Sequence, residues 1–226
     1  MCGRGDQSLT WGEICALLEI IDAEPPDNMR PNHNVAPTHD VLICSEREGK
    51  RVVERMRWGL VPVWAKELPK YSTINAMSET IDEKATWKGS LNKMRCVVPF
   101  NGFYEWRGPK GAKQPFYIRR RDGAPMLIAG LWAFNDKIDP AGMRSFTIIT
   151  CPANKAMSAL HARMPVILNP RDVDLWIGSG PWNDETRALL RPCPEDVLTA
   201  YPVGKAVGSV KNTGPELVEP IGAAAF

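Results

Sequence analysis

Short segments typical of β-strands, separated by turns, dominate the chain between residues 41 and 150 and restrict the folds open to it. Glycine-containing turns at residues 48–50 and 122–123 are typical of hairpins between neighbouring strands. Because strands follow strands without a regular alternation with helices, the pattern predicts a mostly antiparallel α+β fold. The predicted strands span residues 41–45, 51–58, 95–98, 103–106, 115–121, 126–134 and 144–150.

Helices are predicted to flank these strands or to be inserted between them. Thr10 followed by Glu13 forms a capping box, and apolar residues then recur at helical spacing from Trp11 to Ile21. No internal repeat or flexible linker divides the sequence. We therefore expect a single domain over residues 1–221 and a frayed tail over residues 222–226. The other predicted helices span residues 83–92, 153–160, 169–177 and 184–191.

The net charge is small, but the charges are unevenly distributed. The 226 residues contain 28 Lys and Arg against 26 Asp and Glu, a formal charge of +2. Residues 84–121 contain ten basic residues and one acid, or +9, which leaves 18 basic and 25 acidic residues elsewhere, or −7. A local basic field can bind phosphates on a nearly neutral protein, because salt screens charges beyond about 8–10 Å. On charge alone, a solvated hairpin is the favoured interpretation.

The sequence argues against several classes of protein and of site. The longest nearly apolar run, residues 124–134, contains a proline and is too short to cross a bilayer, and the N-terminal residues lack the pattern of a secretory signal. The six cysteines form no CxxC pair and there are three histidines, so we expect reduced thiols in a cytoplasmic protein without a metal site or cofactor. A dinucleotide fingerprint, a P-loop and a GxSxG elbow are also absent from the sequence.

Four residues remain as candidates for chemistry, and each also has a purely structural interpretation. Asn75 is typical of a turn in which its side chain bonds the backbone. Glu105 alternates with two aromatic residues and suits an ion pair with Arg107 or a nearby lysine. His161 follows a predicted helix whose C-terminus it can cap. Cys2 taken alone is an ordinary small residue.

These residues stand in an ordered set of motifs that resembles the SOS response-associated peptidase family from residue 2 to about residue 221. Members of that family process abasic sites in single-stranded DNA. Any one tripeptide says little, but the whole set in this order is specific. The motifs are Met1-Cys-Gly-Arg4, Asn34-Val-Ala-Pro37, Arg57-Trp-Gly-Leu-Val-Pro62 with Trp64, Asn75-Ala-Met-Ser-Glu-Thr80, Arg95-Cys-Val-Val-Pro99, Gly102-Phe-Tyr-Glu-Trp106, His161-Ala-Arg-Met-Pro165 and Val210-Lys-Asn212.

The resemblance implies a covalent reaction at the N-terminus. Once Met1 is removed, Cys2 offers an α-amine and a thiol on adjacent carbons. The amine attacks the aldehyde of an opened abasic sugar to give an imine, and the thiol then adds to the imine carbon and closes a thiazolidine ring. An α-amine with a pKa of about 7.7–8.0 is roughly one-tenth neutral at pH 7, far more than a lysine.

The same resemblance assigns roles to the other three candidates. Asn75 would hold Cys2 in place, and Glu105 would orient the amine or move its proton. His161 would be an acid–base group acting on the opened sugar. Abasic-site lyase activity and self-removal of Met1 are further activities that the resemblance implies.

Contacts with the DNA strand are also implied. Arg4 and Arg163 would bind phosphates beside the lesion, and Trp64 would pack against a base. Met77 departs from the family pattern, which usually has an arginine two residues after the asparagine, so one phosphate contact is expected to be missing here. The residues that can compensate for it are Lys84 and Lys88.

Two other functions stay open from the sequence. Cys2, His161 and Asn75 match the residue types of a cysteine-protease triad, which suggests a thiol peptidase. The basic segment at residues 84–121 is also compatible with a protein that binds single-stranded DNA without any chemistry. The expected partner remains single-stranded DNA containing abasic sites, with no membrane involved.

Overall fold

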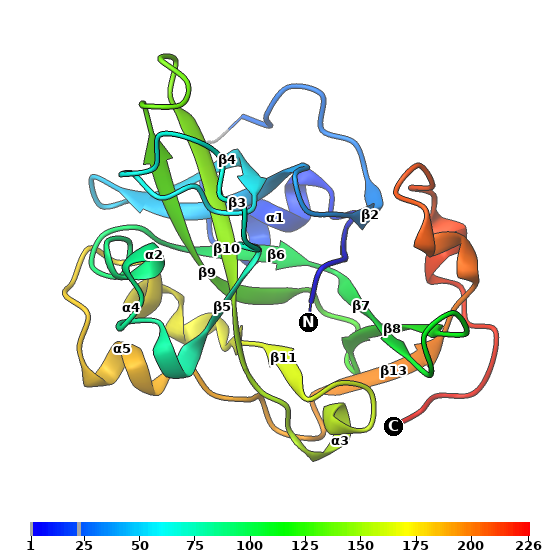
Figure 1. Ribbon diagram of the computed structural model, residues 1–226. Coiled ribbons are helices and arrows are strands. Elements are labelled where there is room, and N and C mark those ends of the chain that lie inside the picture. The colour runs from blue at the N-terminus through cyan, green and yellow to red at the C-terminus, as the bar shows by residue number, and fades with distance from the viewer. Residues whose placement is uncertain (1, 22–23) are drawn as a thin grey trace.

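Figure 1 shows the computed structural model of the chain, which describes residues 2–21 and 24–226. These residues form two β-sheets that are accompanied by short helices. The strands are β1 (Gly5–Gln7), β2 (Asn32–Val35), β3 (Asp40–Arg47), β4 (Lys50–Trp58), β5 (Asn75–Met77), β6 (Arg95–Phe100), β7 (Gly102–Arg107), β8 (Gln114–Arg120), β9 (Met126–Asn135), β10 (Met143–Pro152), β11 (Arg163–Pro165), β12 (Ile167–Leu168) and β13 (Leu198–Pro202). The helices are α1 (Trp11–Leu17), α2 (Ala85–Lys88), α3 (Lys155–Ser158), α4 (Val173–Ile177) and α5 (Asp184–Ala188), with 3-10 turns η1 (Ser78–Thr80), η2 (Pro170–Asp172), η3 (Lys205–Gly208) and η4 (Pro215–Val218).

The larger sheet is closed on itself. Its strand order is β11-β10-β4-β3-β6-β9-β12, and an additional pairing of β9 with β10 joins five of these strands into a ring. The smaller sheet has the order β13-β8-β7-β1-β2. Most pairs are antiparallel, while β10 runs parallel to β4 and β5. The predicted single-domain, mostly antiparallel α+β fold is thus confirmed.

The two predicted hairpin turns have different outcomes. Between β3 and β4, Glu48 and Gly49 both have positive φ, at 52° and 75°, and the flanking Arg47 and Lys50 are paired. Two consecutive positive φ values suit the twist of a tight hairpin, so this prediction is confirmed. The turn at residues 122–123 forms with Gly123 at φ 78°, but it leads from β8 in the smaller sheet to β9 in the larger one. The second predicted hairpin is therefore wrong.

The ring of strands closes where two backbones approach closely. A Cβ at Gly130 of β9 would lie 2.7 Å from the carbonyl oxygen of Thr147 on β10 and 3.0 Å from Cys96 Sγ on β6. That space is too small for a side chain, so glycine is required at this crossing. The ring interior and its surroundings make one large cluster of buried apolar residues that includes strands β3, β6, β9 and β10.

The predicted helices are present but shorter than expected. The first starts at Trp11 behind the capping box of Thr10 and Glu13, as predicted, but it ends at Leu17 and not at Ile21. Glu19 has φ 47°, a left-handed conformation that cannot continue a helix. The regions predicted at 83–92, 153–160 and 184–191 contain single turns, and that at 169–177 consists of η2 followed by α4.

Several short elements and the C-terminus differ from the sequence-based expectation. Strands of two to five residues, such as β1, β2, β5 and β13, are too short to show a period of two in the sequence. Residues 222–226, expected to be frayed, are bonded to β13. Ala225 N donates to Ala200 O at 2.7 Å, Thr199 Oγ1 donates to the carbonyl of Phe226 at 2.8 Å, and the Phe226 side chain packs on the core.

A buried arginine joins β6 to the segment that follows α4. Arg95 is 1% exposed, and its guanidinium donates to the carbonyls of Trp176, Leu91 and Gly178 and, at 2.9 Å, to that of Gly180. The charge is thus solvated by backbone carbonyls in place of water, which buried charges require.

We predict that Arg95→Met destabilises the fold by about 3 kcal/mol or more, because it leaves several carbonyls unpaired in the interior. Urea denaturation measures the free energy of unfolding. The exposed Arg107→Met, on β7, is the matched control and should change it by less than about 0.5 kcal/mol. Equal effects of the two substitutions would show that the carbonyl contacts of Arg95 do not stabilise the fold.

Candidate functional site

The first strand places the N-terminal residues between the two sheets. Gly5 and Asp6 of β1 pair with Phe103 and Gly102 of β7, and just before them Tyr104 N donates to Arg4 O at 3.0 Å. The start of the chain therefore runs along β7, and Figure 1 shows the N-terminus in dark blue.

Cys2 is held from the larger sheet by Asn75. The Asn75 amide Nδ2 donates to the Cys2 carbonyl oxygen at 2.9 Å, and the Cys2 side chain is 1% exposed. Asn75 begins β5, whose position is set by parallel pairing with Ile148 on β10. The other amide atom, Oδ1, is buried and has no hydrogen-bond partner within residues 2–21 and 24–226. The site thus retains one buried acceptor beside the backbone of Cys2.

The smaller sheet contributes a buried carboxyl to the same place. Glu105 lies on β7 and is 5% exposed. Burial, and after it the negative charge of Glu105, raise the pKa of the Cys2 thiol well above its ordinary value. Both effects favour the protonated form of the thiol, and Glu105 is close enough to influence it electrostatically. The structure brings Cys2, Asn75 and Glu105 together from three separate parts of the chain.

His161 is fixed by the loop on which it lies. It follows α3, and its backbone N donates to Met157 O at 3.0 Å. Its ring nitrogen Nδ1 lies 2.9 Å from Arg163 N. The same nitrogen also lies 3.2 Å from Arg163 O, and which of the two contacts is the hydrogen bond depends on the tautomer of the ring. The half-buried imidazole is therefore held in place by its own main chain.

Arg163 has an internal partner in this structure. Two of its guanidinium nitrogens contact the carboxylate of Glu79, with Nη2 to Oε2 at 2.8 Å, and Nη2 also donates to Thr150 O at 2.7 Å. The hydrogen bonds from Arg163 are the largest cause that lowers the pKa of Glu79 to about 2. This bidentate ion pair connects η1, β10 and β11 next to Asn75.

Arg4 likewise makes internal contacts. Its Nη1 donates to Asn34 Oδ1 at 2.8 Å and to Val207 O at 2.7 Å, and its guanidinium lies 5.7 Å from the ring centre of Trp106. The amide of buried Asn34 donates in turn to the carbonyls of Val207, Ser209 and Asn212. In this conformation Arg4 and Asn34 tie β1 and β2 to the η3 region.

The other residues expected to bind DNA are on the surface. Trp64, in the loop between β4 and β5, is 51% exposed, and Met77 of β5 is 38% exposed. Lys84 and Lys88 are exposed at the two ends of α2. Met77 lies midway between Asn75 and Glu79 in the chain and is paired with Thr150 on β10.

Two partners in this region were missed by reasoning from the sequence. Glu79 and Asn34 stand inside the quoted motifs, but nothing in a sequence shows that Glu79 pairs with Arg163 or that Asn34 binds three carbonyls. These hydrogen bonds join residues far apart in the chain. The only signal in the sequence for Glu79 and Asn34 is therefore that each stands in one of the motifs.

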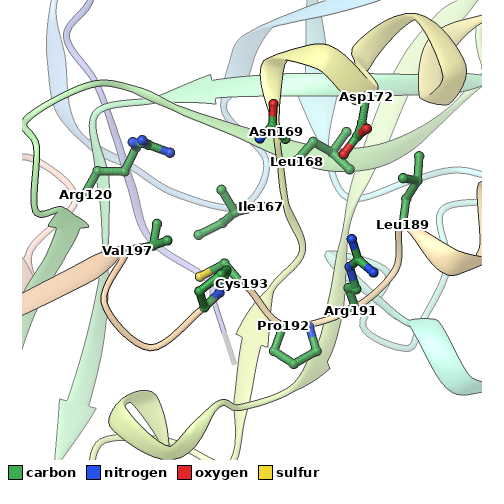
Figure 2. Close-up of a pocket in the computed structure, with 11 residues that line it drawn as sticks. Arg120, Ile167, Leu168, Asn169, Asp172, Leu189, Arg191, Pro192, Cys193 and Val197 are labelled. Carbon is green, nitrogen blue, oxygen red and sulfur yellow. The ribbon is translucent and has the colours of Figure 1, made fainter.

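A well-formed cavity lies elsewhere in the molecule. It has a volume of about 230 Å³, and Figure 2 shows Arg120 on one side of it, with Asp172 and Arg191 on the other. Cys2, Asn75, Glu105 and His161 do not line it, so the candidate site is defined by its contacts and not by this cavity.

Within residues 2–21 and 24–226, His, Cys, Asp and Glu form no group of three or more that could bind a metal ion. The helices in this part of the chain are too short or too polar to span a membrane.

Known proteins resemble this chain in sequence and in structure. Residues 1–210 match the family model described as SOS response associated peptidase (SRAP). The chain is 35% identical to abasic site processing protein YoqW of Bacillus subtilis, covering 97% of this chain and 99% of that one, and 33% identical to abasic site processing protein YedK of Escherichia coli, covering 98% and 100%. A crystal structure of a protein from Bacteroides thetaiotaomicron shares the fold, with a TM-score of 0.83 at 23% identity over 97% of this chain and 99% of that one.

An ion pair in β1 and β2 makes the anchoring of the N-terminal strand dependent on pH. His33 Nδ1 lies 3.2 Å from Asp6 Oδ1, and Tyr117 donates to Asp6 Oδ2 at 2.7 Å. The hydrogen bond with Asp6 is the largest cause that raises the pKa of His33. Because the pKa of His33 is higher in the folded than in the unfolded chain, the ion pair stabilises the fold fully at pH values below the pKa of histidine in the unfolded chain, about 6.5. This stabilisation is lost as the pH rises through the pKa of His33 in the folded chain.

We therefore predict that the free energy of unfolding falls between pH 6 and pH 8.5, and that His33→Gln reduces this fall. Urea denaturation at the two pH values measures it. His39→Gln is the control and should leave the fall unchanged. A fall that is the same in His33→Gln and in the wild-type protein would contradict the assignment.

Proposed function

The chain belongs to the SOS response associated peptidase (SRAP) family, and from that premise we propose that it binds abasic sites in single-stranded DNA and joins them covalently through Cys2. The observation that supports this most directly is the position of Cys2. The second residue of the chain is buried between an amide from one sheet and a carboxyl from the other, with Asn75 Nδ2 2.9 Å from its carbonyl oxygen. A residue so close to a chain end is usually loose, so its immobilisation at this point favours a chemical role.

The proposed reaction begins at the α-amine, after removal of Met1, which lies outside the described residues. The amine nitrogen forms a bond to C1′ of the opened sugar, and the oxygen of the aldehyde leaves as water to give an imine. The thiol sulfur then bonds to the same carbon while its proton moves to the nitrogen, which closes the thiazolidine ring. No oxidant or reductant is needed, because an aldehyde and an aminothiol combine with the loss of one water molecule.

Glu105 and Asn75 suit this sequence of steps. A carboxyl buried beside the terminus can accept a proton from the ammonium and return it to the departing hydroxyl group. Asn75 fixes the backbone of Cys2, which limits the positions that the amine and thiol can take. His161, held through Nδ1 by the main chain of Arg163, offers Nε2 for the proposed lyase step on the sugar.

The raised pKa of the Cys2 thiol weighs against the thiol-peptidase alternative. A cysteine protease attacks with a thiolate, which needs a lowered pKa and a cationic histidine beside it. Here burial and Glu105 favour the protonated thiol. A reaction that starts at the amine does not require a thiolate in the resting protein, so the same environment is compatible with the proposed mechanism.

DNA binding would require Arg163 to exchange its partner. A phosphate has the same bidentate match to a guanidinium as a carboxylate. The backbone of a bound strand can therefore take the place of Glu79 on Arg163, while the bond from Arg163 to Thr150 O holds the arginine in position. Trp64, Lys84 and Lys88 are exposed and need no such exchange.

We predict that Cys2→Ser and Cys2→Ala abolish the heat-stable adduct with abasic single-stranded DNA, leaving at most an imine that borohydride can trap. Denaturing gels and intact mass after incubation with the oligonucleotide measure the adduct. Cys15→Ser is the matched control, because Cys15 on α1 is a free and partly exposed thiol. A protein with one extra residue before Cys2 should also fail. A heat-stable adduct in that blocked protein would overturn the thiazolidine mechanism.

His161 is predicted to act chemically on the sugar. Its replacement by alanine should slow strand cleavage by about 100-fold or more, with a small change in melting temperature. His161→Asn separates the two roles, since its Oδ1 can accept the bond from Arg163 N but cannot titrate. We expect it to be as slow as the alanine variant. Restored cleavage in His161→Asn would show that the side chain only positions the loop.

A further inference from the structure

The cavity of about 230 Å³ lies where the edge of the larger sheet meets the smaller sheet. Its first wall is β12, whose Ile167 and Leu168 pair with β9. A second wall comes from the smaller sheet, with Arg120 at the end of β8 and Val197 just before β13. Residues 189–194, which connect α5 to β13, complete the lining. Both sheets and one connecting segment therefore form this cavity.

Hydrogen bonds to neighbouring elements hold the connecting segment in place. Asn154 Nδ2, at the start of α3, donates to Cys193 O at 3.0 Å. Val197 N donates to Pro194 O at 3.3 Å, and Val197 O accepts a bond from Arg121 N at 2.9 Å. The cavity is therefore largely pre-formed, which is typical of sites for small molecules.

The lining combines apolar side chains with charged groups on two sides. Figure 2 shows Arg120 on one side of the cavity, and Arg191 with Asp172 on the other. A ligand that fits this lining has both an apolar part and a charged part. The apolar residues are the buried Ile167 and Leu168 and the half-buried Leu189 and Val197.

Hydrogen-bond donors outnumber acceptors among the charged groups of the cavity. The Arg191 guanidinium forms no ion pair or hydrogen bond with any residue that the structure describes. Arg120 binds Asp122 through Nε and Nη2, and its Nη1 has no hydrogen bond within the same part of the chain. Against these donors, the lining found in residues 2–21 and 24–226 contributes one carboxylate, that of Asp172. The complementary ligand is therefore an anion.

We infer that this cavity binds a short branched-chain carboxylate, with the carboxylate on Arg191 and the branched tail against the apolar lining. A guanidinium matches a carboxylate through two parallel hydrogen bonds. The cavity has room for roughly eight water molecules at about 30 Å³ each, and so for a molecule of about eight non-hydrogen atoms. An uncharged ligand of this size would cover the Arg191 guanidinium without pairing it, which is unfavourable.

Two sources of this chemistry fit the cavity. One is a simple branched acid such as 4-methylpentanoate. The other is a free branched-chain amino acid, which adds an ammonium group for which Asp172 is the partner. The inference does not depend on the proposed function, because Cys2 and the residues around it do not line this cavity.

NMR titration of protein labelled at the methyl groups of Ile, Leu and Val tests the inference, with 4-methylpentanoate as the probe. We expect saturable shifts at the methyl groups that line the cavity, and none at the exposed Val63 and Val210. The dissociation constant should be about 1 mM or lower, the range of good ligands with so few atoms. The uncharged 4-methylpentanamide should bind at least about tenfold more weakly.

Three variants separate charge from shape. R191Q should weaken binding of 4-methylpentanoate about tenfold or more, because it removes the partner of the carboxylate. V197F fills the cavity and should abolish binding. R171Q is the matched control, because Arg171 is exposed on η2 and does not line the cavity, and it should bind as wild-type does. Melting temperatures show that each variant is folded.

Each outcome has a defined consequence. Absence of saturable shifts up to about 20 mM probe would overturn the site. Equal affinity for the acid and the amide, or unchanged affinity in R191Q, would also overturn it, because the carboxylate would not be recognised. Leucine is titrated in parallel. Tighter binding of leucine supports a site for a free amino acid, and weaker binding of leucine supports a site for a simple acid.

Discussion

The structure depends on one strand, β10, because both of its edges are paired along most of its length. Its first half pairs with β9 and β4 and closes the ring of strands. Its second half runs on past these partners and pairs with β5 on one edge and β11 on the other. Since a strand has two hydrogen-bonding edges, this continuation places Asn75 beside Ile148 on one edge and Arg163 beside Pro152 on the other. The ring that forms the core therefore also positions half of the candidate site.

The other half of the site comes from the smaller sheet, through β1 and β7. A Cβ at Gly5 would lie 2.3 Å from the ring of Phe100, so the first strand reaches its position only because glycine stands there. Strand pairing then directs the chain end toward Glu105, where burial raises the pKa of the Cys2 thiol. Chemistry that begins at an amine tolerates such an environment, whereas chemistry that needs a resting thiolate does not. The electrostatics of the site and the proposed reaction are thus consistent with each other.

Internal partners decide which basic residues are available to a ligand. The segment of residues 84–121 with a charge of +9 does not form one basic patch. Arg95 is buried among carbonyls, Arg120 at the end of β8 pairs with Asp122 in the turn that follows, and Thr86 of α2 contacts Tyr71 in the loop before β5. Arg163 has a carboxylate partner, so a phosphate must compete with a bidentate ion pair for it. The net charge of a sequence segment therefore does not predict the electrostatic potential of one surface. Folding distributes the residues of the segment over separate surfaces, and some of them form ion pairs or are buried.

The sequence by itself determined the class of fold, the long strands and the capping box before α1, because these depend on local periodicity and on residues three apart. It also indicated, through the motifs, that Cys2, Asn75, Glu105 and His161 belong together. The structure shows a hydrogen bond between Asn75 and Cys2, and the charge of Glu105 contributes to the raised pKa of the Cys2 thiol. The tertiary structure alone decided the two-to-five-residue strands, the path of the turn at residues 122–123 and the docking of residues 222–226. It also decided that Arg163 pairs with Glu79. These features depend on hydrogen bonds between residues far apart in the chain, whose free energy becomes favourable only once the two sheets have brought them together.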